Sequence, residues 1–195
     1  LVVGVPDSGL VAAKGYSEQS GIPYGMAFHK NSYVGRTFIK PKQSQRESSV
    51  KIKLNVIEEV VKGKRIVMVD DSIVRGTQLR ETTEFLYRNG AKEVHIRPAC
   101  PPLLYGCKYL NFSRSKSEMD LITRRVIAKR EGENVSDKVL ADYADPNSTN
   151  YKEMLEEIRK ELNFTSLKFH RLDDLKASIG ISPCKLCTYC WDGAQ

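Results

Sequence analysis

Short apolar runs alternate with amphipathic segments along the first half of the chain. The runs at 1–5 and 66–69 have the composition of strands that are covered on both faces, and a further strand is expected at 93–99. The segments at 10–20 and 77–89 instead place apolar residues at helical spacing. Strands that alternate with helices predict an α/β fold, with a mainly parallel sheet and helices on both of its faces.

The pattern between these elements is weaker. A short strand is expected at 22–28 and an extended segment at 33–39. The stretch 41–49 is polar and lacks periodicity, which is typical of a mobile loop. Apolar residues recur at helical spacing from Val50 to Val61, which predicts a helix there.

The second half of the chain is predominantly helical by the same criteria. Helices are expected at 119–129, 151–162 and 172–179. A short strand is expected at 164–169, and a tail rich in cysteine closes the sequence.

Changes in composition divide the chain into three parts. They are an α/β core at 1–112, a segment of unassigned role at 113–150 that we interpret as an insertion, and helices with the cysteine tail at 151–195. The first residues are typical of a core strand and lack an initiator Met, so we expect a fragment of a longer protein. No apolar run approaches the length of a membrane span, and no targeting segment is visible.

Basic residues are concentrated between Lys30 and Arg65. The net charge is +7, and ten Lys and Arg residues fall within 30–65. Such a patch suits a polyanion, either a nucleic acid or a metabolite that carries pyrophosphate. A solvated basic face explains Lys51, Lys53, Lys62 and Lys64 equally well.

The strand at 66–69 leads into the most informative motif of the sequence. It ends in two adjacent carboxylates, Asp70 and Asp71, and a loop of small and hydroxylated residues follows before the helix at Thr77. A strand–loop–helix unit directs backbone N–H groups and the positive end of the helix dipole at the loop, which favours a phosphate. The carboxylates beside it can accept hydrogen bonds from sugar hydroxyls. The motif therefore predicts a site for a phosphorylated sugar.

Three motifs in this order resemble the type I phosphoribosyltransferases. They are Pro6-Asp7-Ser8-Gly9, the segment from Lys30 to Pro41, and the segment from Val69 to Thr77. The second motif is similar to the glutamine phosphoribosylpyrophosphate amidotransferase family in particular. The resemblance covers most of the first 112 residues and resumes near residue 151.

The resemblance implies a type I phosphoribosyltransferase fold with a C-terminal appendage of helices and loops. It also implies an enzyme that transfers an amino group to phosphoribosyl pyrophosphate, giving 5-phosphoribosylamine and pyrophosphate in the first step of de novo purine synthesis. Ammonia would come from glutamine through an upstream domain, to which nothing here is similar. A cytoplasmic homo-oligomer that purine nucleotides inhibit is implied as well, and neither a membrane nor a nucleic acid is expected as a partner.

The resemblance assigns four residues to catalysis: Lys30, Arg36, Asp70 and Asp71. The two cations would neutralise pyrophosphate as it leaves a carbon with oxocarbenium character. The two carboxylates would bind the ribose hydroxyls and, with Ser8, hold Mg²⁺. Further substrate contacts are assigned to Ser8, Tyr33, Arg46, Ser72, Ile73, Val74, Arg75, Gly76 and Thr77. Residues 30 to about 54 align with a loop that closes over the substrate and excludes water.

Five cysteines without secretory features argue against a disulfide framework. Cys187 and Cys190 have Cys-x-x-Cys spacing, which Cys184 extends upstream. One branch of the family holds a [4Fe–4S] cluster, and the resemblance implies Cys107, Cys187 and Cys190 as ligands, with the fourth upstream of this sequence. For this chain alone, Cys184 or Cys100 as a substitute ligand, a zinc ion, and reduced free thiols are the alternatives.

Three other functions are compatible with parts of the pattern. Another type I phosphoribosyltransferase would use a purine or orotate acceptor in place of ammonia. A non-catalytic regulator would keep the fold and bind RNA through its basic face. A redox protein would depend on a metal or cluster held by the cysteines.

Overall fold

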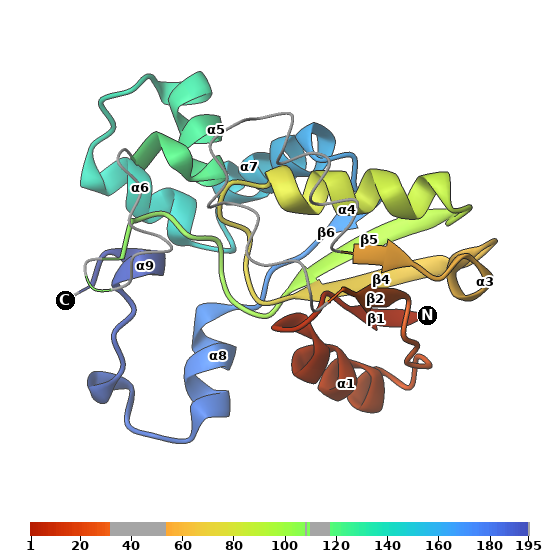
Figure 1. The fold of residues 1–195 in the computed structure, drawn as a ribbon. Helices are drawn as coiled ribbons and strands as arrows, with labels where there is room; N and C mark the ends of the chain where they lie inside the picture. Colours follow the sequence, from red (N-terminus) through yellow and green to blue (C-terminus); the bar gives the residue numbers. More distant parts are fainter. Residues whose placement is uncertain (32–53, 108, 110–117, 195) are drawn as a thin grey trace.

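The computed structural model describes residues 1–31, 54–107, 109 and 118–194. At its centre lies a four-stranded parallel sheet, whose strands stand in the order β1-β4-β5-β6 (Figure 1). The strands are β1 (Val2–Gly4), β4 (Arg65–Asp70), β5 (Glu93–Pro98) and β6 (Ser166–Leu167). The parallel sheet that the sequence predicted is confirmed.

Helices cover both faces of this sheet (Figure 1). On one face, α1 (Gly9–Ser20) packs on β1 and β4 around a small apolar cluster of Val2, Ala13 and Val69. The larger core lies on the opposite face, where Met68 and Ile96 of the sheet share one cluster with the covering helices. These helices are α4 (Thr77–Arg88), α5 (Ile122–Glu131) and α7 (Thr149–Glu161).

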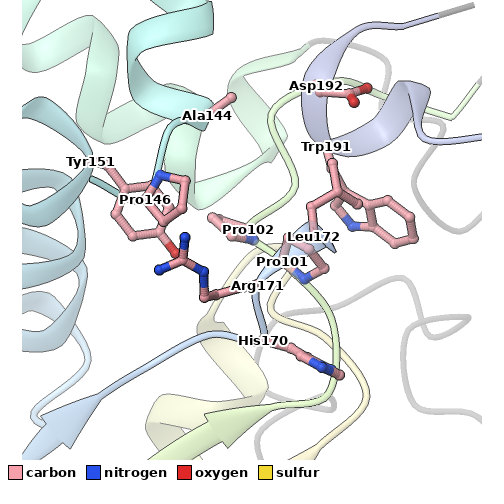
Figure 2. Close-up of a pocket in the computed structure, with 10 residues that line it drawn as sticks. All are labelled: Pro101, Pro102, Ala144, Pro146, Tyr151, His170, Arg171, Leu172, Trp191 and Asp192. Carbon is pink, nitrogen blue, oxygen red and sulfur yellow. The ribbon is translucent and has the colours of Figure 1, made fainter. Parts of the chain in front are cut away.

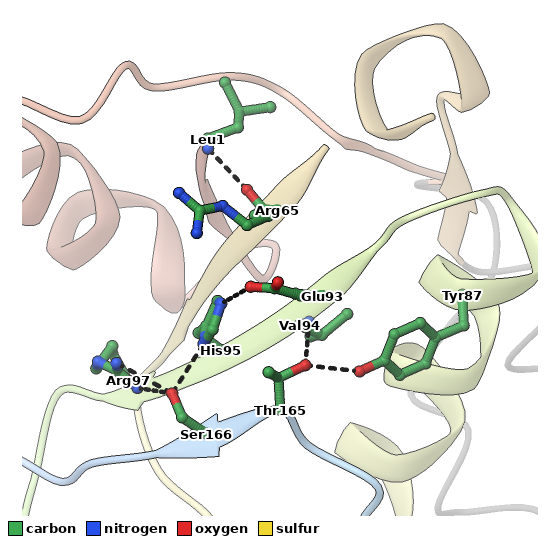
Figure 3. A network of polar contacts seen from close by, with 9 residues as sticks. All are labelled: Leu1, Arg65, Tyr87, Glu93, Val94, His95, Arg97, Thr165 and Ser166. Carbon is green, nitrogen blue, oxygen red and sulfur yellow. Dashed lines mark hydrogen bonds and ion pairs between the residues drawn. The ribbon is translucent and has the colours of Figure 1, made fainter. Parts of the chain in front are cut away.

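A network of side chains holds the two-residue strand β6 to β5. Figure 3 shows the His95 ring between two partners, with Nδ1 2.9 Å from Ser166 Oγ and Nε2 2.9 Å from Glu93 Oε2. Arg97 donates to the same Ser166 hydroxyl from both of its terminal nitrogens. These contacts supplement a backbone ladder in which only two residues of β6 pair with β5.

Two predicted elements in the first half were wrong. The strand expected at 22–28 is found only at β2 (Phe28–Lys30), since Pro23 cannot donate to a ladder and Tyr24 makes a single bridge to Val2. The helix expected at 50–61 is replaced by β3 (Leu54–Val56) and a one-turn helix, α3 (Glu58–Val61). β3 pairs antiparallel with β2, so tertiary pairing outweighed the helical spacing; 50–53 lie outside the described residues.

Among the described residues, the second half adds five further elements to those already named. They are the 3₁₀ turn η2 (Glu118–Asp120), α6 (Asp137–Ala144), α8 (Leu172–Ile179), the 3₁₀ turn η3 (Pro183–Lys185) and α9 (Tyr189–Asp192). Sequence analysis missed α6, whose cap is Ser136 accepting from Val139 N. Ile122, Leu140 and Tyr143 are buried in the same core as the sheet. The division of the chain at 112 and 150 stays a prediction.

Candidate functional site

The candidate site lies where β1 and β4 end side by side. Ser8, in the turn after β1, donates from Oγ to Asp70 Oδ1 at the end of β4, across 3.5 Å. The turn is packed directly on β4, because a Cβ placed on Gly9 would lie 2.4 Å from the Val69 carbonyl oxygen. Parallel strands of an open α/β sheet bind ligands at their carboxyl ends, which is where these side chains meet.

Asp70 is the most perturbed acid of this site. Its side chain is buried, with the residue 8% exposed, and burial raises its pKa to about 7, with the negative charge of Asp71 as the next cause. Asp71 is exposed and donates its backbone N–H to Asp70 Oδ1 at 2.9 Å. Two carboxylates and a hydroxyl form a set of hard oxygen donors, and a cation beside them would offset the charge that burial disfavours. This donor set fits Mg²⁺.

The loop after Asp71 packs on the protein core on one side, and among the described residues its N–H groups are not bound by other protein groups. Ile73 is buried in the core, and Gly76 adopts a positive φ of 80° at the start of α4. A Cβ on Gly76 would lie 2.8 Å from Ile122 Cδ1, so the loop backbone rests directly on α5. Within the described part of the chain, the N–H groups of residues 72–76 have no protein acceptor. These donors suit a phosphate.

The other predicted loop residues differ in exposure. Ser72 and Val74 are half-buried, whereas Arg75 and Thr77 are exposed. The Arg75 guanidinium is paired with Asp120 of η2, at 3.0 Å between Nη2 and Oδ2. Its side chain is thus held on the α5 side of the loop.

Lys30 reaches the same turn from the small sheet. It stands at the end of β2, and its Nζ forms an ion pair with Asp7, the neighbour of Ser8. Sequence reasoning overlooked Asp7 as a partner, although it lies in the motif that contains Ser8. Tyr33, Arg36 and Arg46 lie outside the described residues.

The three cysteines predicted as cluster ligands are brought to one place. Cys107, Cys187 and Cys190 line a cavity of about 330 Å³ together with Cys184. Burial, followed by the influence of Cys107, raises the pKa of Cys190 to about 11. Thiolates suit iron or zinc. In the described part of the chain, however, no group of three Cys, His, Asp or Glu residues is arranged so that it could hold a metal ion.

Cys100 is not among the residues that line that cavity, and it lies close enough to Asp70 and Asp71 to be influenced by their charges. Burial raises its pKa to about 12, and the charge of Asp71 is the next cause. All five cysteines are free thiols.

A second, smaller cavity lies between the segment after β5 and the C-terminal helices. Figure 2 shows Pro101, His170 and Trp191 around it, and its volume is about 30 Å³. This space admits water but no phosphorylated sugar. The cavity is therefore no candidate for the substrate site.

Comparison with known families agrees with this geometry. A family profile described as "Phosphoribosyl transferase domain" matches residues 1–100, which contain Ser8, Asp70 and the loop that follows. The chain belongs to the phosphoribosyltransferase domain family. The predicted type I phosphoribosyltransferase fold is confirmed.

Sequence alignments of this phosphoribosyltransferase domain with its relatives cover nearly the whole chain. It is 42% identical over 193 residues to the amidophosphoribosyltransferase of Methanothermobacter thermautotrophicus and 38% identical over 197 residues to that of Bacillus subtilis. Each alignment covers 99% of this chain and 35% of the relative. The chain thus spans about a third of the length of these curated relatives.

Solved structures show the same relationship. The B. subtilis glutamine phosphoribosylpyrophosphate amidotransferase, complexed with ADP and GMP, superposes with a TM-score of 0.72 at 38% identity. That match covers 99% of this phosphoribosyltransferase domain and 37% of the other chain. No helix among the described residues has the length and apolar character needed to cross a membrane.

Proposed function

We propose that this phosphoribosyltransferase domain transfers an amino group from ammonia to C1 of phosphoribosyl pyrophosphate. The products are 5-phosphoribosylamine and pyrophosphate, as in the first step of purine synthesis. The observation that carries the proposal is the buried Asp70 carboxylate beside Ser8 and Asp71, next to a loop with open N–H groups. The relatives named above support ammonia as the acceptor over a purine base or orotate.

Each part of the substrate has a matching group in the site. The loop at 72–77 receives the 5′-phosphate through its N–H groups and the hydroxyls of Ser72 and Thr77. Asp70 and Asp71 accept hydrogen bonds from the ribose hydroxyls. With Ser8 they would hold Mg²⁺, which supplies positive charge against the diphosphate.

Departure of pyrophosphate requires positive charge near the leaving group. Lys30 stands at the turn that contains Ser8 and can exchange its contact with Asp7 for one with pyrophosphate. Arg36 is proposed for the same task, with Tyr33 and Arg46 as further contacts of the closing loop. No nucleophilic side chain is needed, because ammonia attacks C1 directly.

Regulation and assembly belong to the same proposal. Because the B. subtilis relative is complexed with ADP and GMP, we include inhibition by purine nucleotides. A homo-oligomeric assembly of the intact enzyme is part of the same proposal. The free thiols are compatible with a reducing compartment, and we place the enzyme in the cytoplasm. The cysteine-lined cavity is proposed as the site of a [4Fe–4S] cluster in an intact enzyme whose upstream part supplies a further ligand.

The test is pyrophosphate release from phosphoribosyl pyrophosphate with Mg²⁺, using ammonia, hypoxanthine, adenine or orotate as acceptor. We expect release with ammonia alone. Lys30→Met should lower kcat by about tenfold or more, whereas Lys62→Met, which removes a similar lysine–carboxylate pair on α3, should not. Release only with a free base would identify a different phosphoribosyltransferase. RNA retention in a gel shift, without any turnover of phosphoribosyl pyrophosphate, would favour a non-catalytic regulator that binds RNA.

A further inference from the structure

The loop at 72–77, which we call the phosphate loop, is held by hydrogen bonds that α5 donates to its backbone. Ile122 N donates to the Val74 carbonyl at 2.9 Å, and Arg125 Nη2 donates to the Arg75 carbonyl, also at 2.9 Å. Two successive carbonyl groups of the loop therefore point toward the same helix. The helix α5 lies outside the three sequence motifs that identified the site.

The direction of these carbonyls determines the direction of the next N–H groups. In a trans peptide the C=O and the following N–H point in opposite directions, and the described cis peptide is elsewhere, at Pro6-Asp7. With the Arg75 carbonyl held toward α5, the Gly76 N–H points away from α5, toward the open side of the loop. Gly76 at a φ of 80° allows this arrangement.

Arg125 is itself fixed by three partners. Besides the Arg75 carbonyl, it donates from Nη1 to the Asp120 carbonyl at 3.2 Å and lies 3.7 Å from Glu161 Oε1 of α7. Its side chain is only 34% exposed. A planar guanidinium with several donors can serve these directions at once, which an ammonium cannot do as well.

We infer that Arg125 is a positioning residue for the 5′-phosphate: it holds the Arg75 carbonyl and so directs the Gly76 N–H at the bound phosphate. This inference rests on the proposed function, since it assumes that the loop receives a phosphorylated sugar. Arg125 does not touch the ligand and acts through the Arg75–Gly76 peptide.

The matched control is Lys129 on the same helix. Lys129 pairs with Glu161, the same carboxylate that Arg125 approaches, at 3.0 Å. Lys129→Met therefore removes a cation from the same helix and the same carboxylate. Arg125→Met removes in addition the hydrogen bond to the loop, and Arg125→Lys retains one donor.

The experiment measures binding of ribose 5-phosphate and, separately, of magnesium pyrophosphate by calorimetry on the whole chain. Arg125→Met should weaken the binding of ribose 5-phosphate about tenfold. This is the usual contribution of one charge-assisted hydrogen bond, here the bond from the Gly76 N–H to the phosphate. Pyrophosphate binding should stay within about twofold because its contacts are independent of the loop. Arg125→Lys should restore part of the loss, and Lys129→Met should bind both ligands as the wild type does.

Three results would overturn the inference. They are unchanged ribose 5-phosphate binding in Arg125→Met, equal weakening of both ligands, and an equal loss in Lys129→Met. Thermal unfolding of both Met variants accompanies the binding data, and Arg125→Lys supplies the answer if Arg125→Met does not fold. Failure of the proposed function has a different signature, in which the wild-type chain binds neither ribose 5-phosphate nor phosphoribosyl pyrophosphate.

Discussion

Asp71 donates its backbone N–H to the side chain of Asp70, with 2.9 Å between Asp71 N and Asp70 Oδ1. The hydrogen bond favours the ionised form of Asp70, whereas burial and the charge of Asp71 oppose it and prevail, raising the pKa to about 7. Asp70 is thus a carboxyl group that changes its ionisation near neutral pH. The same pKa therefore affects both the binding of a cation by Asp70 and the pH dependence of the protein's stability.

Replacing Asp70 by Asn should stabilise the protein at alkaline pH while abolishing activity. The folded-state pKa of about 7 lies above the usual 3.8, so between these values the folded state holds a proton that the unfolded state releases. Stability from this group is therefore lost as pH rises through about 7. Asp70→Asn removes that loss, which is on the order of 2–4 kcal/mol above pH 8 in the absence of a cation.

Urea unfolding of the wild type and Asp70→Asn at pH 5 and pH 8, without Mg²⁺, checks this. The gain should be present at pH 8 and much smaller at pH 5. Glu133→Gln, which neutralises an exposed carboxylate in the α5–α6 connection, is the control and should change little at either pH. A variant less stable than the wild type at pH 8 would contradict the assigned burial effect.

Binding of phosphoribosyl pyrophosphate with Mg²⁺ should weaken as the solution is acidified. Protons compete with the cation for Asp70, whose pKa is about 7. From pH 8 to pH 6 the affinity should fall roughly fivefold to tenfold, because the ionised fraction of the carboxyl falls by about that factor. Calorimetric titrations at three pH values measure it, and an affinity that is flat over this range would show that Asp70 does not hold the cation.

Gly76→Ala should damage the phosphate loop more than its backbone strain alone explains. At φ 80° an added Cβ lies 2.8 Å from Ile122 Cδ1, so the loop must shift from α5 and its N–H groups turn. We expect ribose 5-phosphate affinity to fall at least about tenfold and stability to fall by about 1 kcal/mol.

Gly180→Ala is the matched control for that change. Gly180 ends α8 at a φ of 73°, and no heavy atom lies within 4 Å of its Cβ position. The two substitutions thus share the backbone strain and differ in the clash and in location. Equal ligand binding by both variants would show that the loop tolerates displacement.

The five thiols should react with a disulfide reagent at distinct rates. Cys184 and Cys187 are exposed, whereas burial raises the pKa of Cys100 to about 12 and that of Cys190 to about 11. Because the thiolate is the reactive form, Cys100 and Cys190 should react last. Mass spectrometry of timed samples assigns the sites, and Cys184→Ser identifies its own phase. Early modification of Cys100 would contradict its placement.

The strand–loop–helix unit from Arg65 to Arg88 was predictable because its signals are local. A β-branched run, an acidic pair, a glycine and an amphipathic helix each act within a few residues. Lys30 and Asp7 show the limit of such signals, since 23 residues separate the partners of that ion pair and nothing in their spacing indicates the contact. The prediction for β3 failed for the same reason, because the nearest paired residues of β2 and β3, Lys30 and Leu54, are 24 positions apart.

What the sequence by itself determined is the parallel α/β fold, the acidic strand end and the loop suited to phosphate, all of which follow from short-range periodicity and turn chemistry. Only the tertiary structure decided that Asp70 is buried beside Ser8, that four cysteines line one cavity, and that Arg125 grips the Arg75 carbonyl. An arginine on an amphipathic helix has the same local pattern whether it is solvated or bound. Its role depends on which backbone group the packing of α5 brings within 2.9 Å.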